Sequence, residues 1–268
     1  MTKKDVQPVD TKELSTLLAD INYQDALRSE DVAIPIIKIV QKGSESIMET
    51  HPEAKHGMLY NSATEELLGN ALEFIPCAFE GKYLMRTPLD KGGGFGGTFN
   101  EKPEGFDISI EGRWHSKEQP DMEVVYTHYH AVLLIGTMDR VIVPVNSSLL
   151  DKAIIEMNSP RSNVLKQLNM DRAIIAMNST QLKISKKWNA SFRNRVNGPI
   201  FLHTYSAMTQ EQRSNNFAFR GWSNVVRVRE STMEEIREAA DFYKYIKSLS
   251  LRSIVSYSEN SVKDDIPV

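Results

Sequence analysis

The stretch from Val124 to Ile135 reads VVYTHYHAVLLI and alternates between two faces. Thr127, Tyr129 and Ala131 share one face, and Tyr126, His128 and His130 share the other. A side-chain period of two predicts a β-strand. Residues 136–139 predict a turn, and Arg140–Val145 predicts a strand that returns beside the first.

Further strands and a few helices are predicted around this stretch. The expected strands are Val32–Val40, Leu72–Ala78, Lys82–Arg86, Arg172–Met177, Ile200–Met208 and Phe217–Val228. The second and third of these are expected to form a hairpin that turns at 79–81. Helices are expected at about 11–19, at Leu149–Met157, from Ser179 to just before Gly198, and from Ser231 to about Ser248. Ser231 and Glu234 have the spacing of a capping box.

These elements predict a mainly β fold with peripheral helices, of the α+β class. We expect a helical N-terminal segment at 1–30, one domain at 31–250 and a disordered acidic tail at 251–268.

Composition narrows the class of protein. The net charge is −3, and the only cysteine, Cys77, excludes an internal disulfide and fits a reducing cytoplasm. The longest purely apolar run, Ala131–Ile135, is too short to cross a membrane, and the first residues lack the apolar core of a signal peptide. Overall acidity argues against a protein that coats duplex DNA by bulk charge, but it allows a local basic groove.

Lys183–Arg229 departs from this acidic balance. It holds nine lysines and arginines against a single acid, Glu211, with seven aromatic residues interleaved. Cations neutralise phosphates and flat rings stack on unpaired bases, so this composition is typical of a groove for single-stranded nucleic acid. The alternative is that the rings fill a core and the charges are a solvated face. The candidate DNA-binding residues in this stretch are Lys183, Lys186, Lys187, Trp188, Arg193, Arg195, Tyr205, Arg220 and Trp222.

A glycine-rich stretch, Lys91–Phe99, contains the spacing G-x-G-x-x-G. A dinucleotide site is excluded because no helix is predicted after it. We expect a mobile flap whose Phe95 and Phe99 close over a strand of nucleic acid, or else a plain loop with both rings in the core. Arg86, Arg113 and Trp114 complete the candidate DNA-binding set.

Neither a metal site nor a catalytic site is indicated. His128 and His130 share a face, but the sequence offers no third ligand at a spacing typical of a zinc site. Two histidines that simply belong to a strand are therefore expected, and not a zinc site. The sequence has no G-x-S-x-G and no H-E-x-x-H. A non-enzymatic protein without a cofactor is therefore expected.

The last residues, Lys263-Asp-Asp-Ile-Pro-Val268, resemble the acidic tip of bacterial single-stranded DNA-binding proteins, with Val268 where that family has Phe. The body resembles the replication single-stranded DNA-binding proteins of lytic bacteriophages over about residues 32–230. The similar segments are Ile34–Ile39, Gly92–Phe99, Ser179–Lys183 and Lys186–Trp188.

This resemblance implies an elaborated OB-like barrel. It also implies a protein that coats single-stranded DNA in phage replication, recombination or repair, in the cytoplasm of the infected bacterial host. Asp264, Asp265, Ile266, Pro267 and Val268 would recruit replication or recombination proteins. The alternatives are a strand-annealing recombination protein, a transcription activator that contacts host RNA polymerase, and a structural phage protein without DNA affinity. No membrane partner is expected.

Overall fold

The computed structural model describes residues 34–88, 91, 93–110, 113–138, 166–194, 198–214 and 217–248. All of them belong to one compact unit, Ile34–Val268. The predicted N-terminal helical segment, the strand Arg140–Val145, the helix Leu149–Met157 and the acidic tail lie outside the described residues.

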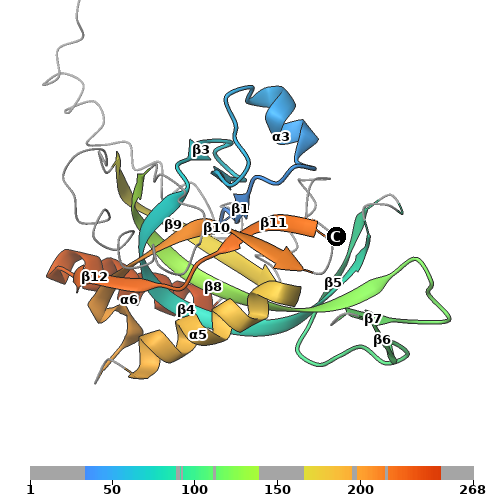
Figure 1. Cartoon of the computed structure of the whole chain (residues 1–268). Coiled ribbons are helices and arrows are strands. Elements are labelled where there is room, and N and C mark those ends of the chain that lie inside the picture. The colour runs from blue at the N-terminus through green and yellow to red at the C-terminus, as the bar shows by residue number, and fades with distance from the viewer. Residues whose placement is uncertain are drawn as a thin grey trace, which may run out of the picture. The chain divides into compact units, whose positions relative to one another are not determined.

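A nine-stranded sheet forms the body of this unit (Figure 1). Its strands are β4 (Ala71–Thr87), β5 (Gly94–Phe99), β6 (Ile108–Ile110), β7 (Arg113–His115), β8 (Glu123–Met138), β9 (Lys166–Asn178), β10 (His203–Ser214), β11 (Phe217–Trp222) and β12 (Val226–Glu230). The order is β11-β10-β4-β8-β7-β6, with β12 on β10, β5 on β4 and β9 on β8. The prediction of a mainly β fold with few helices is confirmed. The sheet is not closed into a barrel, because no described pairing joins its end strands β11 and β6.

The longest pairing joins β4 to β8, from Ala71 opposite Met138 to Arg86 opposite Glu123. The predicted hairpin at 72–86 is therefore wrong, since Gly81 pairs with His128 in the middle of one continuous strand. The register shifts between Pro76 and Ala78, where proline offers no N–H to the ladder.

A small three-stranded sheet is formed by residues that precede the main sheet in the chain. It consists of β1 (Ile37–Ile39), β2 (Leu59–Asn61) and β3 (Leu67–Leu68), with α3 (Glu45–Thr50) between the first two strands. The side chain of Gln41 donates to the carbonyl of Arg220 and accepts from its N–H. These two hydrogen bonds attach the small sheet to β11.

Both faces of the sheet are covered around residues 71–78 of β4, 129–135 of β8 and 173–177 of β9, which explains the apolar runs there. On one face, α5 (Leu182–Asn194) packs Trp188 and Phe192 against strand residues such as Phe74. On the other, α6 (Met233–Ser248) packs Phe242 and Ile246 against residues such as Leu133. Two short 3-10 turns, η3 (Ser179–Gln181) and η4 (Ile200–Leu202), precede α5 and β10.

The start of α6 corrects one sequence prediction. The capping box is made by Thr232 and Glu235, one residue later than predicted: the N–H of each residue donates to the side chain of the other. Arg229 also donates twice to Glu235, and this pairing holds the pKa of Glu235 below its usual value. The box and the ion pair together fix the junction between β12 and α6.

Candidate nucleic-acid interface

One side of α5 is cationic and open to solvent. Ser185, Trp188 and Phe192 are buried at helical spacing. The opposite side exposes Lys183, Lys186, Lys187 and Arg193, which we call the cationic stripe. None of the four forms an ion pair with a residue that the structure describes. Their charges are therefore available to an external anion.

Beneath α5, Ser185 connects two histidines of β8. Its Oγ lies 2.7 Å from Nδ1 of His128 and 2.7 Å from Nε2 of His130. A hydroxyl has a single proton, so Ser185 donates to one ring and accepts from the other. Burial lowers the pKa of His130 to about 3. Burial, and then the charge of Lys186, lowers the pKa of His128. Both rings are neutral at pH 7, and this pair is part of the packing under the helix.

A line of rings continues from this pair along β4, β8 and β7. It consists of Phe79, His128, Tyr126, Tyr83 and Trp114, which we call the aromatic row. Successive ring centroids are 4.9, 5.2, 4.9 and 5.6 Å apart. All but the buried His128 are partly exposed. The row thus has ring surface that a base can reach.

Backbone pairing places these rings on one face. Tyr83 lies opposite Tyr126 and Gly81 lies opposite His128 in the β4–β8 ladder. Tyr126 lies over Gly81, where a Cβ would collide with the tyrosine hydroxyl. Phe99 of β5 pairs with Tyr83 and so faces the same side. The absence of a side chain at Gly81 therefore leaves room for the ring of Tyr126 at the centre of the row.

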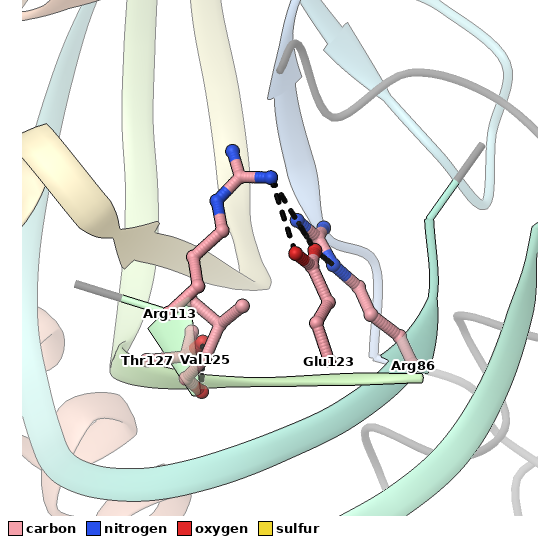
Figure 2. Close-up of polar contacts among 5 residues, drawn as sticks. All are labelled: Arg86, Arg113, Glu123, Val125 and Thr127. Atoms are coloured by element: carbon pink, nitrogen blue, oxygen red, sulfur yellow. Dashed lines mark hydrogen bonds and ion pairs between the residues drawn. The ribbon is translucent and has the colours of Figure 1, made fainter. Parts of the chain in front are cut away.

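A buried carboxylate holds the strand that carries Trp114. Figure 2 shows Arg86 of β4 and Arg113 of β7 converging on Glu123 of β8. Nη2 of Arg86 lies 2.8 Å from Oε1 of the glutamate, and Nη1 of Arg113 lies 3.2 Å from Oε2. The glutamate side chain is 2% exposed. Because neighbouring strand residues face opposite ways, this contact fixes Trp114 on the face of the row.

The structure gives Arg86 and Arg113, two of the candidate DNA-binding residues, a different role. Both guanidinium groups contact a protein carboxylate and are mostly buried, with side chains 13% and 18% exposed. They position the aromatic row instead of offering free cations. No sequence pattern pointed to Glu123, because its partners come from two other strands.

Three predicted stacking residues belong to the core. Trp188, Tyr205 and Trp222 are 0%, 1% and 2% exposed. Trp188 stacks on Phe74 and donates its indole N–H to the carbonyl of Ser223. These rings have no face open to a base, because Trp188 packs against Trp222 and Phe192 packs against Tyr205 within one buried cluster.

The remaining candidates occupy different places. Arg220 packs its aliphatic carbons toward Gly57, where a Cβ would come within 3.2 Å, so it belongs to the contact with the small sheet. In the glycine-rich stretch, Gly94–Phe99 forms the strand β5 instead of a flap, and Phe95 and Phe99 are partly exposed. Arg195 lies outside the described residues.

Two ring residues of the row, Phe79 and Tyr126, are not among the residues predicted from the sequence, whereas Tyr83 is expected there to face the groove. The alternation of Tyr126 with His128 is visible in the sequence. The pairing of that face with β4, which brings Phe79 and Tyr83 alongside, is not.

Neither a membrane span nor a metal site is found in the part of the chain that the structure describes. No helix there has the length and apolar content to cross a membrane. No cluster of three or more His, Cys, Asp or Glu side chains among these residues is arranged to hold a metal ion.

The fold and this face define a protein with a large antiparallel sheet and one cationic, aromatic side. The chain belongs to the family of Pam3 phage gp34-like proteins, whose family model matches residues 9–252. No curated protein and no solved structure matches the chain.

Proposed function

We propose that this phage protein binds single-stranded DNA, without catalysing a reaction, through the cationic stripe and the aromatic row. It would act in phage DNA replication, recombination or repair, in the cytoplasm of the infected host. The observation that carries the proposal is the meeting of these two features on one side of the sheet. Ser185, which precedes Lys186 in α5, places its Oγ 2.7 Å from Nδ1 of His128 in the row, and the charge of Lys186 contributes to lowering the pKa of that histidine.

The two features match the two parts of a nucleotide strand. Four cations without described ion-pair partners suit a line of phosphates, whose binding releases counterions. Partly exposed rings in sequence suit bases that are free to stack. Lys183 and Arg193 are ten residues apart, about 15 Å along a helix at about 1.5 Å per residue. The stripe can therefore follow several phosphates of one strand.

Unpaired bases are favoured over a duplex. The rings lie side by side on one face of the sheet and are partly exposed. A ring stacks readily on the face of a base that is unpaired, whereas the base faces of a duplex are already stacked on one another. The chain has a net charge of −3, so bulk attraction to duplex DNA is weak. Residues 264–268 would recruit replication or recombination proteins, as their resemblance to the bacterial acidic tip suggests.

The test is fluorescence anisotropy of labelled oligo-dT, with a duplex of equal length beside it, at two salt concentrations. The variant changes Lys183, Lys186 and Lys187 to Gln. The matched control changes Lys42, Lys55 and Lys244 to Gln, which removes the same charge from exposed lysines elsewhere on the protein.

The wild type is expected to prefer oligo-dT, with salt-sensitive affinity. Each lost phosphate contact lowers the salt slope by about 0.7 for a single strand, so the stripe variant is expected to lose about 2. The control is expected to keep the wild-type slope. No binding of oligo-dT at low salt refutes the proposal. Equal salt slopes for the stripe variant and the control would show that the DNA does not bind at α5.

A further inference from the structure

A cleft of about 470 Å³ opens beside the register shift of β4. Residues 76–79 form one wall, and the end of α5 forms another with Asn189, Phe192 and Arg193. Residues 198–201 and the end of α6, with Tyr243 and Lys247, complete it. The volume lies within the range of about 300–1,000 Å³ that is usual for small-molecule sites.

The described side chains that line the cleft include aromatic rings and cations but no anions. Four aromatic side chains, from Phe79, Phe192, Phe201 and Tyr243, line it. Its two charged lining residues, Arg193 and Lys247, are both cations, exposed to solvent and without an ion-pair partner in the part of the chain that the structure describes. No carboxylate is among the described residues that line it. Such a site suits a ligand that joins a flat apolar ring to an anionic group.

The cleft is continuous with both parts of the proposed interface. Arg193 is the last cation of the stripe and also lines the cleft. Phe79 is the first ring of the aromatic row and also lines the cleft, 5.2 Å from the ring of His130. A strand that follows α5 toward its C-terminus therefore arrives at the opening.

We propose that this cleft holds one unpaired nucleotide of the bound strand. The base enters among Phe79, Phe201 and Tyr243. The phosphate meets Arg193 and Lys247, and the amide of Asn189 is available to a polar edge of the base. This inference rests on the proposed function, but the cleft can be tested with a mononucleotide alone.

The first measurement is calorimetric titration of the full chain with dTMP, and with thymidine and inorganic phosphate separately. The variant carries Arg193→Gln and Lys247→Gln. The matched control carries Arg237→Gln and Lys244→Gln, two exposed cations of α6 that do not line the cleft. Circular dichroism of all proteins confirms that they are folded.

The expected result is that dTMP binds more tightly than either thymidine or phosphate. The cleft variant should lose about tenfold or more in dTMP affinity, because two charged contacts to phosphate are removed. The control should keep the wild-type affinity. Equal binding of phosphate and dTMP would show an anion site with no pocket for a base, and would overturn the inference.

The second measurement is photo-cross-linking of oligo-dT that contains one 4-thiothymidine, followed by peptide mapping. A cross-link to the peptide holding Phe201 or Tyr243 supports the cleft. If oligo-dT binds but cross-links only to Tyr83, Tyr126 or Trp114, the inference that the cleft holds a nucleotide is refuted. The proposed function then still holds. Binding of dTMP without binding of oligo-dT would leave a nucleotide site in the cleft and overturn the proposed function.

Discussion

The buried histidine pair predicts a specific loss of stability in acid. His130 has a folded pKa of about 3, against an ordinary value near 6.5, because burial disfavours its charged form. Below pH 6.5 the unfolded chain therefore binds a proton that the folded chain does not. A depressed histidine pKa makes the folded state lose stability as the pH falls from about 6.5 toward 3.

The magnitude follows from the two pKa values. One proton bound only by the unfolded state costs about 1.4 kcal/mol per pH unit. Between pH 7 and pH 5 the histidine of the unfolded chain becomes almost fully charged, so His130 alone removes about 2 kcal/mol from the free energy of unfolding. His128 acts in the same direction. This is a substantial part of the roughly 5–15 kcal/mol that is usual for a domain.

The assay is urea unfolding, followed by tryptophan fluorescence, at pH 7, 6 and 5. His130→Gln is compared with the wild type, since glutamine can place its amide near Oγ of Ser185 without titrating. Carboxylates that titrate in both proteins cancel in the difference. The wild type is expected to be the more stable at pH 7, and its advantage should shrink by about 2 kcal/mol at pH 5. An advantage that is the same at both pH values would refute the reasoning.

Four further predictions concern single residues. Glu123→Gln should destabilise the fold by about 3 kcal/mol, since two largely buried arginines lose their carboxylate, and urea unfolding measures this. Trp188→Ala should cost about 3–5 kcal/mol by the same assay, because it empties the core beneath α5. Tyr126→Ala should stay folded by circular dichroism but weaken oligo-dT binding by about 1–3 kcal/mol in anisotropy; unchanged affinity would exclude this ring from stacking. Cys77 has a pKa raised to about 12 by burial, so mass spectrometry should find it alkylated by iodoacetamide only after unfolding.

The local pattern of apolar and polar residues was sufficient to predict several helices and strands. The alternation at Val124–Ile135 predicted the core of β8, and the cations of Lys183–Arg193 were placed correctly on a helix. These predictions succeeded because the spacing of apolar residues along a strand or helix can be read from residues that are close in the sequence. The capping signal before α6 was also present, although Thr232 and Glu235 form the box instead of the adjacent pair.

Pairing between distant segments decided the rest. The sequence around Gly81 resembles a turn, yet a partner strand of sixteen residues keeps β4 continuous through it. Closure of the sheet likewise depends on whether its end strands meet, and β11 and β6 do not pair in the described part of the chain. Neither outcome is encoded in a local period, because both depend on the length and register of the partner strands.

Local residue patterns were enough to predict that this chain is mainly β and that Lys183–Arg229 concentrates cations and aromatic rings. Which rings of the chain are available to a ligand depends on the packing of its elements. Trp188 and Trp222 are covered by packing, whereas Tyr83, Tyr126 and Trp114 stay partly exposed. The physical reason is that alternation assigns a side chain to a face, while burial depends on which layer packs against that face.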